Sequence, residues 1–198
     1  MGKNLVILGF EGAYTAEGML ERANVTARDT MLVPGASGGV GGALVQLAKL
    51  RGARVIAMAS EAKHEDVAKC GPDRILPRGP VDLRAALGDE KITVVADVVG
   101  GDYWPQLIDI LERGGRYTCS GAIAGPMVEL DLRTFYLRDL TFTGSTVLPQ
   151  PVFHNLVRYI SEGRLTPMLA ATYPLKDLRE AQQAFIDKRH TGNLVVTP

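Results

Sequence analysis

The chain has 198 residues, 46% hydrophobic and 22% charged, and its Lys and Arg residues balance its Asp and Glu residues at 22 each, giving zero formal net charge. This composition is typical of a globular domain with a sizeable core, and the neutral balance argues against a surface for nucleic acid or an anionic membrane. Because there is no bilayer-length apolar run, no secretion-signal pattern and no cysteine spacing for a metal or disulfide at Cys70 and Cys119, we expect a cytoplasmic protein.

The first quarter of the sequence predicts a helix, then a strand, a glycine turn and a second helix. Residues 15–23 are helical in pattern, with Thr15 placed to cap them, and the apolar run 30–33 predicts a strand. Gly38 and Gly39 in the following turn have no Cβ, so a phosphate can approach the backbone. The N-terminus of the next helix directs free N–H groups and the positive end of its dipole to the same place. This architecture binds a dinucleotide pyrophosphate, although a glycine turn alone is equally compatible with an ordinary connection.

The rest of the chain alternates strands and helices. The predicted strands and extended segments are residues 53–59, 73–76, 92–99, 116–120, 140–145, 170–174 and 193–196, and the predicted helices are residues 61–70, 83–87, 104–111, 132–137, 152–162 and 178–189. Alternation with short connections indicates an α/β fold, in which helices cover both faces of a parallel sheet. We expect one domain, followed after about Thr166 by a C-terminal appendage.

Two glycine fingerprints match the turn. Gly35-x-x-x-Gly39-x-Gly41 is the pattern of short-chain dehydrogenases, which need a Tyr and a Lys four residues apart for proton transfer. None of the six tyrosines is followed by Lys at that spacing, so this interpretation fails on its chemistry. Ala36-x-Gly38-x-x-Gly41 resembles the turn of the medium-chain dehydrogenase/reductase superfamily, above all its quinone oxidoreductase and enoyl reductase branch.

The resemblance covers residues 14–198 and includes A-Y-T-A-E-G-M-L-E-R-A, G-A-S-G-G-V-G, A-D-V-V-G-G, E-R-G-G-R-Y and H-T-G-N-L-V-V-T-P. It implies a doubly wound Rossmann sheet of six parallel strands and hydride transfer with NAD(P)(H). By matching position, the pyrophosphate would be held by Ser37, Gly38, Gly39 and Val40. The ribose and nicotinamide would be lined by Val99, Gly100, Gly121, Ala122 and Ile123, with Thr15 approaching the nicotinamide.

The resemblance also implies a division of the chain. We expect an N-terminal segment at residues 1–14, the NAD(P)-binding domain at 15–166 and a C-terminal segment at 167–198. Members of the family carry an N-terminal GroES-like catalytic barrel that supplies most of the substrate pocket, and almost nothing precedes Tyr14 here. The chain therefore resembles the cofactor-binding part, with its C-terminal segment made to pack on such a barrel, and no catalytic residue can be named.

The end of the second predicted strand bears on the choice between NADP(H) and NAD(H). An acid at this strand tip would accept hydrogen bonds from the ribose 2′-OH and repel a 2′-phosphate. This strand ends at Ala59 without an acid, and Ser60 and Lys63 follow, which can bind a phosphate. NADP(H) is therefore favoured over NAD(H), with Glu61 as counter-evidence and a solvated Lys63 as the alternative.

Zinc and partner binding complete the expectations. Glu11 falls near the position where zinc-dependent members place a metal-ligating Cys, but a single carboxylate is not a metal site, so no zinc is expected on this chain. Asp97, at the end of a central strand, is assigned a structural hydrogen-bonding role. The strand around Thr141 and Thr143 should lie at a sheet edge, where the resemblance suggests a homodimer.

The leading hypothesis is an NADPH-dependent medium-chain oxidoreductase that delivers hydride to an enone, a quinone or an enoyl thioester. We expect a small-molecule substrate, no nucleic-acid or membrane partner, and a homodimer. The isolated chain should bind the cofactor and turn over poorly. The alternatives are the cofactor domain of a zinc-dependent alcohol dehydrogenase, a non-catalytic NADPH-binding module and, more distantly, a methyltransferase.

Overall fold

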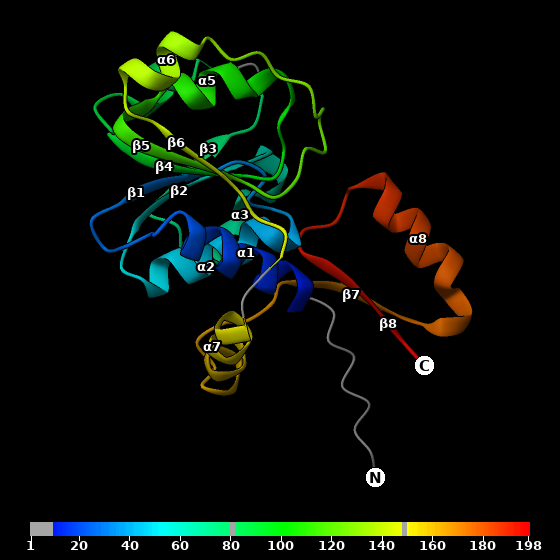
Figure 1. Cartoon of the computed structure of the whole chain (residues 1–198). Helices are drawn as coiled ribbons and strands as arrows, with labels where there is room; N and C mark the ends of the chain where they lie inside the picture. Colours follow the sequence, from blue (N-terminus) through cyan, green and yellow to red (C-terminus); the bar gives the residue numbers. More distant parts are fainter. Residues whose placement is uncertain (1–9, 80–81, 148–149) are drawn as a thin grey trace.

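The computed structural model describes residues 10–79, 82–147 and 150–198. Its main feature is a six-stranded, entirely parallel sheet in the order β3-β2-β1-β4-β5-β6 (Figure 1). The strands are β1 (Thr30–Val33), β2 (Arg54–Ala59), β3 (Arg74–Pro77), β4 (Ile92–Asp97), β5 (Leu111–Cys119) and β6 (Thr141–Gly144). The helices around this sheet are α1 (Phe10–Arg22), α2 (Gly39–Leu50), α3 (His64–Ala68), α4 (Leu83–Leu87), α5 (Trp104–Asp109), α6 (Leu132–Leu137) and α7 (Gln150–Ser161).

The strand order reverses at β1, which confirms the predicted doubly wound Rossmann fold. The chain runs outward from β1 through β2 to β3, and then returns to the other side of β1 to build β4, β5 and β6. β1 is consequently hydrogen-bonded to both β2 and β4. The crevice beyond the carboxyl ends of β1 and β4 is the point where sheets of this type bind their ligands.

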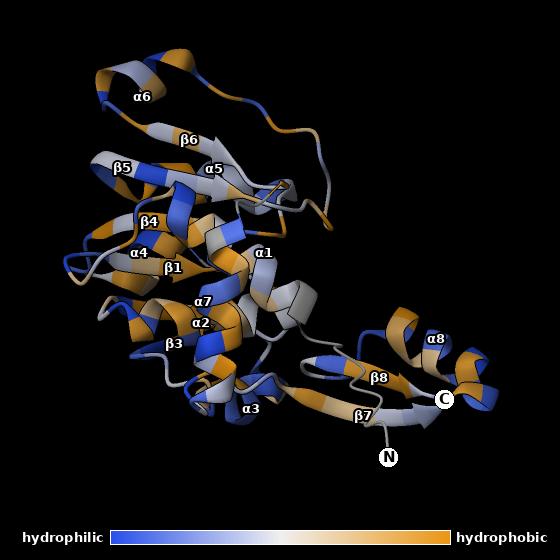
Figure 2. Cartoon of the chain, turned by 60° about the horizontal axis from the view of Figure 1, so that its bottom comes forward, coloured by the Kyte–Doolittle hydropathy of each residue, from blue (hydrophilic) through white to orange (hydrophobic). Residues whose placement is uncertain are grey.

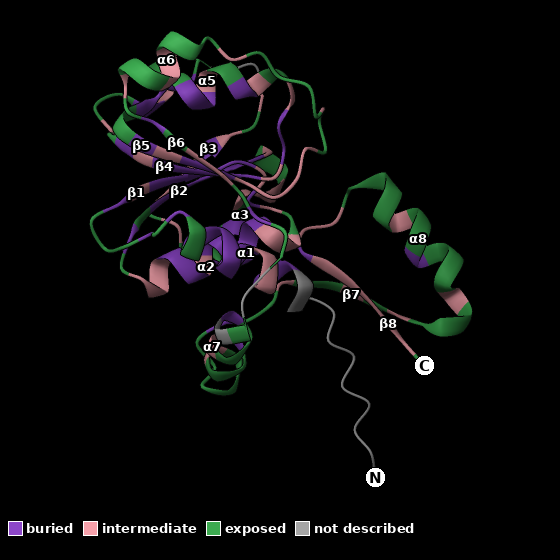
Figure 3. Cartoon of the chain, viewed as in Figure 1, coloured by how far each residue is buried: buried purple, intermediate pink, exposed green. Residues whose placement is uncertain are grey.

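Two hydrophobic layers hold helices on the two faces of the sheet. Met31 and Val33 of β1 pack in one layer with α1, α2 and α7, and Leu32 between them packs in the other with α4 and α5. Successive strand residues point to opposite faces, so a strand buried on both sides must be apolar throughout. The central strands β1, β2 and β4, together with α2, are accordingly buried along most of their length (Figure 3) and largely hydrophobic (Figure 2).

The C-terminal part forms a separate unit beside the main sheet. β7 (Leu169–Pro174) and β8 (Asn193–Thr197) pair in parallel, with α8 (Leu178–Asp187) between them in sequence. The unit extends away from the main sheet near the start of α2 (Figure 1). Gln46 of α2 exchanges two hydrogen bonds of 3.0 Å with the backbone of Thr166 and so fixes the connection.

Several predicted boundaries were wrong. α1 begins at Phe10 instead of Thr15, so Thr15 lies inside the helix and cannot be its N-cap. The predicted helix at 61–70 is a 3-10 turn (Glu61–Lys63) followed by five residues of α3. β5 begins before the glycine pair at 114–115 that was expected to precede it, and its register with β4 shifts there. No helix in the described ranges is long and apolar enough to cross a membrane.

Candidate cofactor-binding site

The turn between β1 and α2 opens the N-terminus of α2 toward solvent. Gly35 has a φ of 69°, and the N–H of Gly38 donates to the Gly35 carbonyl at 3.1 Å. Gly38 is the exposed N-cap of α2, it offers no side-chain oxygen, and no acid stands in the first turn. The first N–H groups of a helix have no intrahelical partner, so this end of α2 has the chemistry to hold an anion.

The glycines at the start of α2, and Gly12 of α1 beside them, differ in the space around them. A Cβ on Gly41 would lie 2.2 Å from the Gly35 oxygen and 2.7 Å from Cα of Ala36, and one on Gly12 would lie 2.9 Å from the Gly39 carbonyl carbon. A Cβ on Gly38 would meet only the Gly35 oxygen, at 3.6 Å. Gly12 and Gly41 therefore permit close packing inside the fold, whereas Gly38 leaves room on the outside, where a ligand would lie.

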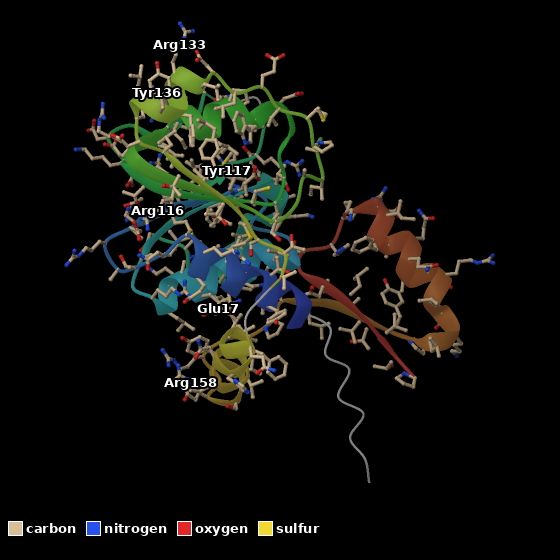
Figure 4. The ribbon with its side chains drawn as sticks, in the orientation of Figure 1. Glu17, Arg116, Tyr117, Arg133, Tyr136 and Arg158 are labelled. Carbon is tan, nitrogen blue, oxygen red and sulfur yellow. The ribbon has the colours of Figure 1, made fainter. Side chains whose placement is uncertain are left out.

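A second turn follows β4 and is held by Asp97. This fully buried carboxylate accepts hydrogen bonds from the N–H of Val99 at 2.7 Å, from the N–H of Gly100 at 3.1 Å and from the hydroxyl of Tyr117 at 2.8 Å. Burial and the negative charge of Asp97 raise the pKa of Tyr117, so its proton stays on the phenol. Figure 4 shows Tyr117 on the α5 side of the sheet. The structural role predicted for Asp97 is confirmed.

The turn after β5 lies against the turn after β4. The N–H of Ala124 donates to the Val99 carbonyl at 2.8 Å, and Gly100 and Gly125 form a parallel bridge. Gly100 has a φ of 63°, and a Cβ there would lie 2.7 Å from the Gly125 oxygen. Residues 99–101 and 121–125 consequently form one backbone-to-backbone assembly at the edge of the crevice.

The predicted site residues gather at one edge of the sheet, because they follow parallel strands. Ser37 to Val40 follow β1, Ser60 and Lys63 follow β2, Val99 and Gly100 follow β4, and Gly121, Ala122 and Ile123 follow β5. The turn after β1 lies against the turn after β4. A Cβ added to Gly35 would be only 2.9 Å from Cγ2 of Val99. Thr15 is half-buried within α1, and Ile123 is 78% exposed.

Lys63 is engaged with the C-terminal unit. Its Nζ donates to the carbonyl of Lys188 at 2.9 Å and to that of His190 at 2.6 Å. Burial lowers the pKa of Lys63, and the positive charges of Arg78 and Lys188 lower it further. The side chain of Glu61, whose negative charge would oppose a phosphate if it turned inward, is exposed.

Arg78 and Asn193 are two residues at this edge that the sequence did not indicate. Arg78 follows β3, and its N–H donates to the Ala59 carbonyl at 2.7 Å, which places its backbone beside the tip of β2. Asn193 begins β8, and its Oδ1 lies 2.3 Å from the position that a Cβ on Gly39 would take. Arg78 could have been found as the first residue after a strand adjacent to β2, but nothing local in the sequence places Asn193 on the glycine turn.

The described residues contain no group of three or more His, Cys, Asp or Glu side chains that could hold a metal ion. The side chain of Glu11 lies outside the described set. His64 Nε2 lies 3.0 Å from the Ala59 carbonyl and His190 Nδ1 lies 3.2 Å from the Ala184 carbonyl, so both rings contact the backbone. The donor groups of the described residues do not fit a zinc site.

Comparisons with known proteins identify relatives of this chain. Residues 39–162 match the family described as zinc-binding dehydrogenase. The acryloyl-coenzyme A reductase of Metallosphaera sedula is 29% identical over 180 residues, which is 90% of this chain and 53% of that protein. The quinone oxidoreductase of Pongo abelii is 26% identical over 196 residues, covering 93% of this chain and 58% of that protein.

A solved structure of a putative alcohol dehydrogenase from Sinorhizobium meliloti superposes with a TM-score of 0.90 at 46% identity. The match covers 94% of this chain and 53% of that one. The chain thus spans about half the length of the relatives that it matches.

Proposed function

The chain belongs to the zinc-binding dehydrogenase family of the medium-chain dehydrogenase/reductase superfamily, and from this premise we propose that it supplies the cofactor-binding part of an NADP(H)-dependent oxidoreductase. The observation that carries the proposal is the open N-terminus of α2 at Gly38, beside the reversal of strand order at β1. The pyrophosphate would lie on this helix end, and the backbone of residues 99–101 and 121–125 would border the ribose and nicotinamide.

The preference for NADP(H) rests on the charges near the tip of β2. Burial lowers the pKa of Lys63 most, and the positive charges of Arg78 and Lys188 each lower it further. A 2′-phosphate dianion beside these side chains would offset their positive charges, and the strand ends without an acid that would oppose it. NAD(H), which has a hydroxyl at this position, gains nothing from the three cations.

The proposed chemistry is the reduction of a conjugated carbonyl compound: an enone, a quinone or an enoyl thioester. Bound NADPH would supply the hydride, and this chain's residues would hold and orient it. The names of the acryloyl-coenzyme A reductase and quinone oxidoreductase relatives support this substrate class. The expected packing of residues 167–198 on a second, substrate-binding domain stays a prediction.

A second candidate is the cofactor domain of an alcohol dehydrogenase, because the Sinorhizobium meliloti protein, titled a putative alcohol dehydrogenase, is 46% identical. The two candidates share the cofactor site and differ in the rest of the enzyme. Metal analysis of a complete homologous protein, together with activity assays on alcohol and enone substrates, would distinguish the two candidates.

The test of the cofactor site is a pair of titrations with NADPH and NADH, followed by fluorescence or calorimetry. We expect tight NADPH binding by the wild-type chain, and we expect Lys63→Ala to weaken it by about tenfold or more, since a hydrogen bond to a charged group contributes about 1.5–3 kcal/mol. NADH affinity should change little. The control is Lys91→Ala, an exposed lysine at the opposite end of the strands. Failure of the wild type to bind either nucleotide would refute the proposed function.

A further inference from the structure

The C-terminal unit is attached to the proposed cofactor site at two places. The N–H of Gly192 donates to the Ser37 carbonyl at 2.8 Å in the glycine turn. Lys63 donates to the carbonyls of Lys188 and His190 beside the tip of β2. Residues 188–192 therefore lie along the same edge at which the pyrophosphate and the 2′-phosphate of NADPH are proposed to bind.

Docking of this segment brings positive charges together. The positive charges of Arg78 and Lys188 each lower the pKa of Lys63, and the nearby Asp66 raises it. The Lys188 ammonium itself lies over the ring of Phe185, 3.6 Å from its centroid. Asp66 is also paired with Lys69 at 2.7 Å, so its negative charge is shared. The contacts of Lys63 with residues 188 and 190 therefore form against the positive charges of Arg78 and Lys188.

The ammonium of Lys63 has enough donors to bind the backbone carbonyls of residues 188 and 190 and a phosphate at the same time. An ammonium carries three N–H donors, and two of them are used on the carbonyls of Lys188 and His190. The third donor remains for a phosphate oxygen, so binding a phosphate does not require Lys63 to release the segment.

We propose that Lys63 couples binding of a 2′-phosphorylated nucleotide to docking of the C-terminal unit: a phosphate on the third donor of Lys63 offsets the positive charges of Arg78 and Lys188 that act on it, and thereby strengthens the hydrogen bonds of Lys63 to residues 188 and 190. This inference rests on the proposed NADP(H) site and deepens it. Because coupling between two binding events is reciprocal, the docked segment also raises the affinity for NADPH over NADH.

The test is hydrogen exchange on the full chain, read from peptides that cover residues 186–193, with two saturating probes. Adenosine 2′,5′-bisphosphate carries the 2′-phosphate, and adenosine 5′-monophosphate is the matched control without it. We expect the bisphosphate to slow exchange of these amides by about fivefold or more relative to the monophosphate, the lower end of typical coupling. If the bisphosphate binds but slows exchange of these amides no more than the monophosphate does, or speeds it, the coupling is wrong. The proposed cofactor site would not be affected by that result. Absence of any bisphosphate binding would refute the site itself, and the coupling with it.

Two variants separate the role of Lys63 from general loosening. Lys63→Gln should speed exchange at 186–193 in the free protein and abolish the difference between the probes, whereas the control Lys91→Gln should leave both unchanged. Lys188→Gln retains the backbone carbonyl that accepts from Lys63 and removes one of the repelling charges. It should slow exchange of the segment in the free protein and narrow the difference between the probes. Thermal unfolding would confirm that each variant is folded. If amide exchange at residues 186–193 in either folded variant equals that of the wild type, the proposal is wrong.

Discussion

Gly38 and Gly41 lie three residues apart in the same turn and have different physical reasons to be glycine. At Gly41 the obstacle to a side chain is the fold itself, since a Cβ would overlap the Gly35 oxygen and Cα of Ala36. At Gly38 the backbone has a φ of −85°, which any residue adopts, and a Cβ has room in the protein. We therefore expect the proposed ligand, and not the fold, to require glycine at position 38.

The two alanine variants should fail in different ways. Gly41→Ala is expected to lower the free energy of unfolding by about 1–3 kcal/mol, the usual cost of overpacking, because the obstructing atoms are backbone. Gly38→Ala should keep the wild-type unfolding free energy within about 0.5 kcal/mol and weaken NADPH and NADH together, since the methyl group would stand where the pyrophosphate approaches. Urea denaturation and nucleotide titration of both variants make the comparison. If the Gly38→Ala protein binds both nucleotides as tightly as the wild type, the proposal that the pyrophosphate binds at this turn is wrong.

The sequence revealed local features of the site and missed the long-range ones. The glycine turn and the strand tips were predictable because their signals lie within a few neighbouring residues. The partners of Lys63 were not, since Lys188 and His190 are 125 and 127 residues away along the chain. The position of Asn193 on Gly39 depends on how the C-terminal unit folds back, which no local pattern encodes.

Among the elements, α1 shows how a helix start was misplaced. Thr15 is a good N-cap by residue type, but Ala13 and Ala16 continue a buried face that extends to Leu20, and Gly12 permits close contact with the start of α2. Tertiary packing thus extended the helix past a favourable local stop. The strands were predicted more closely because continuous apolar runs bounded by glycine specify buried parallel strands strongly.

The packing of α1 on α2 also buries a charge. Glu17 of α1 is 1% exposed and accepts a hydrogen bond from Arg51 at 2.8 Å, while its Oε2 has no hydrogen-bond partner among the described residues. Figure 4 shows Glu17 among the elements below the sheet. Burial raises the pKa of Glu17 above its usual 4.5, and the nearby Arg51 opposes this effect.

Glu17 should therefore make stability depend on pH in a defined direction. A carboxyl whose pKa is higher in the folded than in the unfolded state holds its proton more tightly when folded, so its stabilising contribution is complete below pH 4.5 and is lost as the pH rises through the folded-state pKa. Glu17→Gln has no such titration. The unfolding free energy of Glu17→Gln minus that of the wild type should increase as the pH rises above 4.5.

Urea denaturation at a series of pH values measures this difference directly. The matched control is Glu21→Gln, which removes the same charge from an exposed position of α1 that contacts the same Arg51 at 3.4 Å. Parallel pH curves for the Glu17→Gln and Glu21→Gln proteins would show that burial of Glu17 has no energetic consequence.

For the whole molecule, the β6 edge of the main sheet is the feature that suggests assembly. Among the described strands β6 pairs only with β5, so its other side presents unpaired backbone groups. Beside it, α6 exposes Leu132, Tyr136 and Leu137 at 66%, 60% and 57% of their surface, and Tyr136 lies on the outer side of α6 in Figure 4. An unprotected edge next to apolar side chains favours pairing with another strand, and a second copy provides the same strand.

We expect the chain to form a homodimer in which two β6 strands pair across a two-fold axis, as the family resemblance suggested. Thr141, at the start of β6, is exposed, and Thr141→Lys would place like charges near that axis. The dimer should weaken by about tenfold or more, since juxtaposed like charges cost several kcal/mol. Light scattering after size-exclusion chromatography over a range of concentrations measures this change. Ala68→Lys on α3, beside the opposite half of the sheet, adds the same charge and should leave the dimer intact. A monomeric wild type, or equal dissociation of both variants, would show that β6 is not the interface.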